Sequence, residues 1–139
     1  MASLETLLGL VRILGGLRIC TTVNEDYKLE VFSRAKYLAI VDDAGNAFEL
    51  LPNPALNSPT KRPRVAKECV SLGADVVIAP RGSLCYPSYK ILKKANVKTY
   101  VANPGTDLSS IDLNQLRAPD WREVLGSSIQ AVKERLFGH

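Results

Sequence analysis

The stretch G-A-D-V-V-I-A-P-R-G-S, residues 73–83, decides the fold of this chain. Its four consecutive apolar residues, Val76 to Ala79, are followed by a loop that holds Pro80, Gly82 and Ser83. An uninterrupted apolar run between turn residues is typical of a strand that is buried on both faces. Because ligands of open α/β sheets bind beyond the carboxyl ends of such strands, the stretch also predicts a site at its loop.

Helix and strand patterns alternate on both sides of this strand. A hairpin followed by alternating helices and strands predicts an α/β fold with a mixed five-stranded sheet and helices on both of its faces. Pro63 is predicted to lie in the first turn of a helix, where its missing N–H costs no hydrogen bond. Besides 76–79, the predicted elements are strands at 17–22 and 98–101, a hairpin of 37–41 and 48–51 around the turn 42–46, and helices from Pro63 to Gly73 and from 87 to 95.

The two ends of the chain extend this predicted central domain, residues 17–111. Residues 1–16 carry leucines at helical spacing, which predicts an amphipathic helix that packs on the core or contacts a second copy. Residues 112–139 contain a second helix, with Asp120 as N-cap and Glu123 as its capping-box partner. Its apolar stripe is predicted to pack on the sheet, an oligomer contact being the alternative; the stripe consists of Trp121, Val124, Leu125, Ile129, Val132 and Leu136.

Composition places the chain among ordinary globular domains. The chain has 139 residues, which is long enough for one core. Its content of 46% hydrophobic and 23% charged residues argues against disorder. The net charge of +4 suits an anionic ligand, although solvated surface lysines explain it equally well. Three scattered cysteines make no disulfide framework, and Cys20 and Cys69 are interpreted as core residues. We find no signal peptide or membrane span, and expect a cytoplasmic protein.

Catalytic residues are scarce in the sequence. The single histidine, His139, is the last residue, so a Ser–His or Cys–His pair would depend on the chain terminus. Asp42 and Asp43 belong to a turn, and Asp75 leads into a strand. We therefore expect a protein that is not an enzyme.

Candidate binding residues gather around the loop that follows the buried strand. Cys85 lies between this strand and the next helix, whose N-terminus favours a thiolate or another anion. Basic side chains precede the second strand, occupy the stretch before Pro63 and adjoin Gly82. The sequence leaves open whether they form one electropositive rim or lie spread over the surface. The candidate cofactor-binding residues are Arg34, Lys61, Arg62, Arg81, Gly82, Ser83 and Cys85, with Cys85 also the candidate metal ligand.

Four segments together resemble the nitrogenase iron-molybdenum cofactor-binding family, which includes NifX, NafY and the C-terminal part of NifB. They are V-F-S-R-A-K-Y-L-A-I-V-D (31–42), N-P (53–54), G-A-D-V-V-I-A-P-R-G-S (73–83) and V-K-T-Y-V-A-N-P-G-T (97–106). The resemblance spans residues 17–111 and implies a ribonuclease-H-like fold without nuclease activity. It also implies an iron–sulfur or iron–molybdenum type cluster as ligand.

The chain departs from this family at a position that matters for metal binding. Many members have H-F-G-R-A where this chain has Val31-Phe32-Ser33-Arg34-Ala35, so a histidine ligand is replaced by Val31. Two hypotheses follow. One is a non-catalytic carrier of an anionic metal–sulfur cofactor, with Cys85 as ligand and the basic residues neutralising charge. The other is a metal-free regulatory or interaction module that binds another anionic ligand or a protein; nucleic acid is a less favoured partner, and a homodimer is compatible with both.

Overall fold

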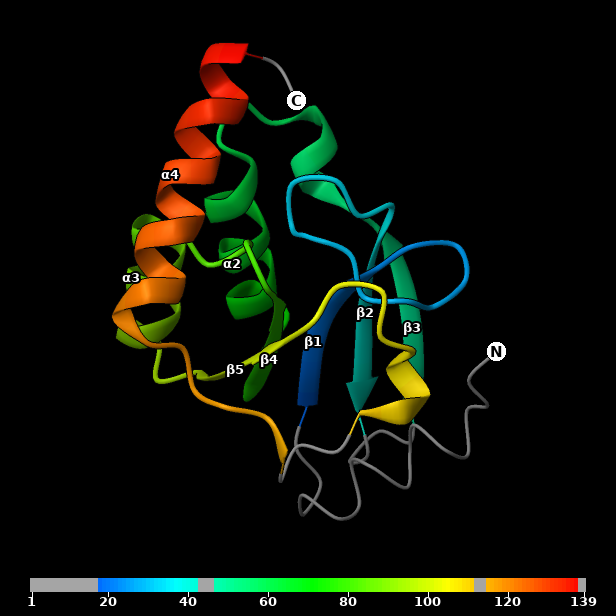
Figure 1. Ribbon diagram of the computed structural model, residues 1–139. Helices are drawn as coiled ribbons and strands as arrows, with labels where there is room; N and C mark the ends of the chain where they lie inside the picture. The colour runs from blue at the N-terminus through cyan, green and yellow to red at the C-terminus, as the bar shows by residue number, and fades with distance from the viewer. Residues whose placement is uncertain (1–17, 43–46, 112–114, 138–139) are drawn as a thin grey trace.

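The structure, a computed structural model, describes residues 18–42, 47–111 and 115–137. In these residues five strands form one mixed sheet, and three α-helices lie together on one side of it (Figure 1). The strands are β1 (Arg18–Val23), β2 (Tyr37–Asp42), β3 (Ala47–Pro52), β4 (Val76–Pro80) and β5 (Lys98–Ala102). The helices are α2 (Lys61–Ser71), α3 (Tyr86–Lys94) and α4 (Trp121–Phe137), and two short 3-10 turns are η1 (Pro54–Asn57) and η2 (Leu108–Ser110).

The strand order β3-β2-β1-β4-β5 places the first strand at the centre of the sheet. Cys20 of β1 lies opposite Ile40 in the antiparallel pair with β2, and opposite Val77 in the parallel pair with β4. β5 continues the parallel half. The carboxyl ends of β1, β4 and β5 therefore reach the same edge of the sheet, where β2 begins and β3 ends. We call this edge, with the loops 24–36, 81–85 and 103–107, the carboxyl edge.

The predicted strands, hairpin and helices are confirmed within a few residues, and all five residues of β4 are buried as the opening stretch indicated. The prediction of helices on both faces is wrong for the described residues. α2 and α3 cover one face, where Val65 and Leu92 pack with Cys20 and Val77. The apolar cluster on the other face includes Leu29, Leu108 and Ile111. Loop segments and η2 therefore cover that face. The predicted helix at 1–16 and the turn at 43–46 lie outside the described residues.

Cys20 and Cys69 are fully buried, which confirms their assignment to the core. They also form a disulfide between β1 and α2, with a Cα–Cα distance of 5.9 Å, which the sequence analysis did not predict. A pair separated by 49 residues gives no signal in a single sequence, since only the fold brings the two thiols together. Cys85 is the free cysteine.

The orientation of α4 contradicts the prediction that its apolar stripe packs on the sheet. Leu125, Ile129 and Leu136 are 51%, 49% and 70% exposed, whereas Glu123 and Ser127 are buried. The physical reason is the surface that α4 meets. The helix lies against loop 81–85 and the first turns of α2 and α3, which offer N–H groups and a guanidinium group in place of apolar side chains. Its polar face therefore makes the better contact.

Candidate functional site

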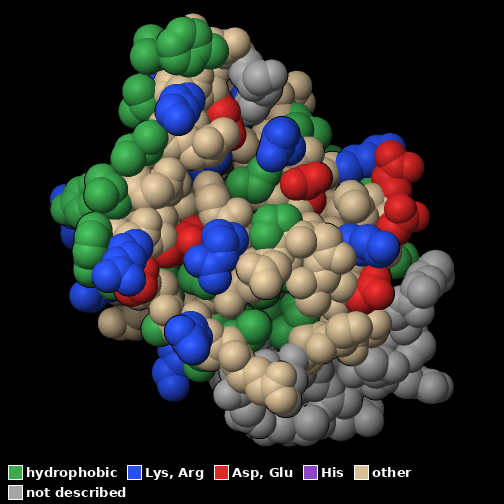
Figure 2. Space-filling view, viewed as in Figure 1, with side chains coloured by type: hydrophobic (Ala, Val, Ile, Leu, Met, Phe, Trp, Pro, Cys, Tyr) green, Lys and Arg blue, Asp and Glu red, His purple; other side chains and the backbone are tan. Residues whose placement is uncertain are grey.

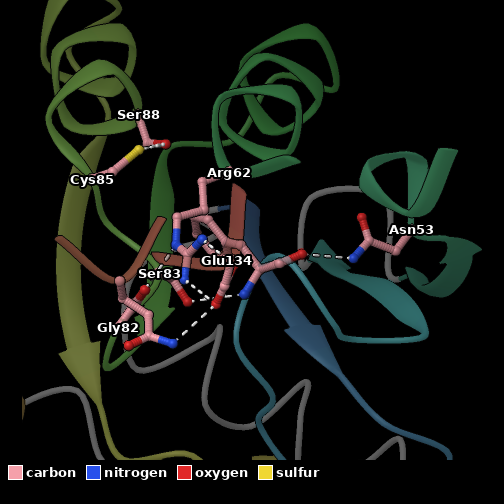
Figure 3. A network of polar contacts seen from close by, with 9 residues as sticks. Asn53, Arg62, Gly82, Ser83, Cys85, Ser88 and Glu134 are labelled. Carbon is pink, nitrogen blue, oxygen red and sulfur yellow. Dashed lines mark hydrogen bonds and ion pairs between the residues drawn. The ribbon is translucent and has the colours of Figure 1, made fainter. Parts of the chain in front are cut away.

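The loop after β4 forms a tight turn at the carboxyl edge. Gly82 has a φ of +94°, a conformation that favours glycine, and the Ser83 N–H donates to the carbonyl of Pro80. The buried Ser83 hydroxyl accepts a hydrogen bond from the Phe32 N–H at 3.0 Å (Figure 3). Ser83, predicted as a cofactor-binding residue, thus joins two loops of the protein.

Asn53, at the end of β3, fixes the neighbouring loop from the other side. Its Nδ2 donates to the carbonyls of Phe32 and Ala35, at 2.9 and 2.8 Å. Its Oδ1 accepts the N–H of Ala55 and so caps η1. Both N–H groups and the oxygen of the Asn53 amide are used in this way, and the segment 32–35 is held in place.

Arg62 is the most buried charged side chain of the carboxyl edge, with 3% of its side chain exposed. It lies in the first turn of α2, one residue before Pro63, where the predicted helix begins. Its Nε donates to the carbonyl of Gly82 at 2.9 Å, and its Nη1 and Nη2 donate to the two carboxylate oxygens of Glu134 at 2.7 and 3.0 Å. Burial alone would raise the pKa of Glu134, but the hydrogen bonds and charge of Arg62 outweigh it and lower that pKa to about 2.

A second carboxylate of α4 binds the same loop. Oε2 of Glu123 accepts the Gly82 N–H at 2.8 Å and the Ser127 hydroxyl at 2.9 Å, and Oε1 lies 3.4 Å from Nη1 of Arg81. We call Arg62, Arg81, Gly82, Glu123 and Glu134 the edge cluster. The Glu123 N–H is capped by Asp120, as predicted, but the reciprocal capping-box contact is not made, because the Glu123 carboxylate binds Gly82 instead.

A groove of about 540 Å³ lies beside the edge cluster, between the first turns of α2 and α3 and the second half of α4. Cys85, the N-cap of α3, is 4% exposed, lines the groove and has its Sγ 3.0 Å from the Ser88 hydroxyl. Cationic side chains surround it, while the one carboxylate in its lining, Glu134, is paired with Arg62. We call this the cysteine groove; its cations besides Arg62 are Lys61, Lys67 and Arg135.

The predicted site residues thus divide into three groups. Cys85, Lys61 and Arg62 line the cysteine groove. Arg81 and Gly82 hold Glu123, and Ser83 holds Phe32. Arg34 is exposed in loop 24–36 and does not line the cysteine groove.

Comparison with protein families gives a match to the model described as dinitrogenase iron-molybdenum cofactor, over residues 16–111. The chain belongs to this family. Two solved structures resemble it: the apo form of the orange protein from Desulfovibrio gigas (21% identity, TM-score 0.62, 75% of this chain and 93% of that chain) and a Thermotoga protein described as NifB-like (27%, 0.57, 73% and 92%). No curated protein matches the chain significantly.

Because the chain belongs to this family, the residue at position 31, here Val31, bears on metal binding. This residue is buried, and its Cγ2 lies 3.9 Å from where a Cβ on Gly82 would stand. A side chain at position 31 therefore faces the loop after β4. With valine there, no ligand atom is available at this place in the carboxyl edge.

A metal site made by protein ligands alone does not fit the residues present. No three His, Cys, Asp or Glu side chains come together in a ligand group within 18–42, 47–111 and 115–137. Cys85 with three cations does fit a negatively charged cluster that brings its own sulfide ligands. The cysteine groove can thus supply one thiolate and a positive surround for such a cluster.

Four groove and edge residues were missed from the sequence: Glu123, Glu134, Lys67 and Arg135. The signal for the two glutamates was present, since Glu123, Ser127 and Glu134 share one face of a helix by their spacing. The apolar stripe on the opposite face outweighed it. No sequence signal pointed to Lys67 and Arg135, because only the packing of α2 beside α4 brings them to one groove.

Proposed function

We propose that this protein is a non-catalytic carrier that binds an anionic metal–sulfur cluster in the cysteine groove. The observation that carries the proposal is the composition of the groove. One thiol lies among three cationic side chains, at the carboxyl edge of a domain of the iron-molybdenum cofactor family. The two similar structures are those of an orange protein, in its apo form, and of a NifB-like protein.

In this proposal each group has a separate task. Cys85 provides a thiolate ligand, and Lys61, Lys67 and Arg135 balance the negative charge of the cluster. The edge cluster supports the groove wall, since Arg62, Arg81 and Gly82 bind α4 through Glu134 and Glu123. Arg34 is a further cation of the rim. The bound cluster itself would supply the metal and sulfide chemistry.

A metal-free binding module is the second candidate, and the edge cluster favours it. The carboxyl edge already binds two carboxylates, both from a helix that lies outside the family match. Carboxylate binding requires no metal, so the same edge suits an acidic protein segment or a small anion. In this case Cys85 plays no part in binding.

The test is loading of the full chain with iron and sulfide in the absence of oxygen, followed by absorption spectra and metal analysis. The carrier proposal expects cluster absorption that Cys85→Ser abolishes and that Lys61→Gln/Arg135→Gln weakens. Lys90→Gln, an exposed lysine of α3 outside the groove lining, is the matched control and should load normally. Equal loading of wild type and Cys85→Ser would refute the thiolate ligand, and no loading at all would leave the metal-free module as the better candidate.

Two finer proposals accompany this function. The strand order β3-β2-β1-β4-β5 supports a ribonuclease-H-like, NifX-like assignment of the fold. A cytoplasmic location remains our proposal, and no described helix is long and apolar enough to cross a membrane. Disulfides are rare in the cytosol, so the oxidation state of Cys20 and Cys69 in cells tests that location directly.

A further inference from the structure

The outer face of α4 carries a continuous row of exposed apolar side chains. Figure 2 shows these side chains along the outer edge of the helix, at the left of the view, with lysine and arginine side chains beside them. Spacings of four, three and four residues connect Leu125, Ile129, Val132 and Leu136, a pattern that suits packing against another helix. Exposed apolar patches rimmed by polar groups mark interaction sites. The row consists of Trp121, Leu125, Ile129, Val132, Leu136 and Phe137.

The row continues into a hollow between α3 and α4. The hollow measures about 480 Å³, and its walls are mainly the aromatic and aliphatic side chains of Tyr86, Tyr89, Trp121, Val124 and Leu125. A concave apolar surface beside an apolar ridge accepts the projecting side chains of a partner helix. A flat lipid surface would leave this hollow unfilled. The shape therefore favours a protein partner over a bilayer.

Apart from Asp120, which lines the hollow and accepts the Glu123 N–H, the charges around the row are positive. The basic residues of α4 are exposed, whereas both of its acidic residues point inward, to Gly82 and Arg62. α3 contains no acidic residue, and Asp120 binds the N-terminus of α4. A second copy of this chain would bring the same cations against these cations. The exposed basic residues of the two helices are Lys90, Lys93, Lys94, Arg122, Lys133 and Arg135.

From the row, the hollow and the charges, we propose that the outer face of α4 docks an acidic amphipathic helix of a partner protein. The apolar side of that helix covers the row and fills the hollow, and its carboxylates meet the lysines and arginines on both sides. Trp121, Tyr86 and Arg122 supply the residue types that dominate binding energy at interfaces. Val132 of the row and the neighbouring Arg135 also line the cysteine groove, so the two sites adjoin.

Trp121 provides the readout, because it is the only tryptophan of the chain and lies 68% exposed in the row. The probe is a synthetic helical peptide of about 20 residues, with leucines on one face, glutamates on the other and no aromatic residue. Titration of the full chain should shift the emission of Trp121 to shorter wavelength and saturate. Added salt should weaken binding, since charge attraction contributes to it.

Variants locate the contact. Leu125→Asn/Ile129→Asn should weaken peptide binding by about tenfold or more while leaving the circular dichroism spectrum unchanged, because both side chains are exposed. Leu56→Asn, an exposed leucine on η1, is the matched control and should bind as the wild type does.

Four results would overturn the proposal. The first is no emission change up to about 1 mM peptide, a range that covers weak binding. The second is equal binding of a peptide with lysine in place of glutamate. The third is a dimer by light scattering that Leu125→Asn/Ile129→Asn dissociates, which would assign the face to a second copy. The fourth is sedimentation with phosphatidylserine vesicles that the same variant abolishes, which would assign it to a membrane.

Discussion

Helices α2 and α4 meet through one ion pair, yet they bury opposite kinds of side chains. α2 packs Val65, Ala66 and Cys69 against the sheet, as its apolar spacing predicts. α4 buries Glu123 and Ser127 and leaves its apolar residues exposed. The difference lies in what each helix covers: α2 lies on the apolar face of the sheet, and α4 lies on polar loops at the carboxyl edge. A helix buries the face that its neighbours can satisfy, which is not always its apolar one.

Breaking the ion pair between the two helices should have the largest effect. Arg62→Met leaves the buried carboxylate of Glu134 without its cation, and removing one partner of such a pair costs about 3–5 kcal/mol of unfolding free energy. Urea unfolding at pH 7 measures it. Arg62→Met/Glu134→Leu removes both charges and should recover most of the loss. A single variant that loses under about 1 kcal/mol would mean that the pair is solvated, as exposed pairs are.

Lowering the pH should weaken the contact between Arg62 and Glu134 over a defined pH range. The pKa of Glu134 is lowered in the folded protein from 4.5 to about 2, so its contribution is complete above its unfolded pKa and is lost as the pH falls through about 2. The shift, 4.5 minus 2, corresponds to a contribution on the order of 3 kcal/mol.

The variant Glu134→Gln isolates this contribution from that of the other carboxyl groups. Unfolding free energies of wild type and variant should differ most above pH 5 and converge toward pH 2, measured by urea unfolding at each pH. A difference that stays constant across this range would contradict the lowered pKa.

Shortening an apolar side chain should cost more unfolding free energy on α2 than on α4, although the difference is smaller than the effect of breaking the ion pair. Val65→Ala, in the fully buried face of α2, should cost about 2 kcal/mol, because it removes packed methyl groups. Ile129→Ala, on the exposed face of α4, should change stability by less than about 0.5 kcal/mol. Thermal or urea unfolding of dilute protein makes the comparison. Equal costs would show that the row on α4 is covered in solution.

Much of the fold could be predicted from local sequence patterns. The buried run Val76–Ala79, the hairpin and the position of Pro63 each depend on neighbours in the chain, and each is confirmed. The disulfide and the orientation of α4 could not be predicted in the same way. Both depend on segments far apart in sequence, as in the 72 residues between Arg62 and Glu134.

The site was predicted in part for the same reason. Loop 81–85 and Cys85 follow directly from the strand before them, and they lie at the carboxyl edge as expected. The basic rim was left open, because a list of lysines and arginines does not tell which of them find acidic partners. Arg62 and Arg81 form ion pairs with carboxylates of α4, whereas Lys61 lines the cysteine groove.

The central position of β1 has a consequence for folding during synthesis. β1, β2 and β3 precede β4 in the chain and pair with one another. The other side of β1 must wait for β4, since Thr21 and its partner Ile78 are 57 residues apart. Until then the future middle of the sheet is an open edge, with N–H and C=O groups ready to pair with another nascent chain. The central strand of the finished sheet thus has an exposed edge during synthesis.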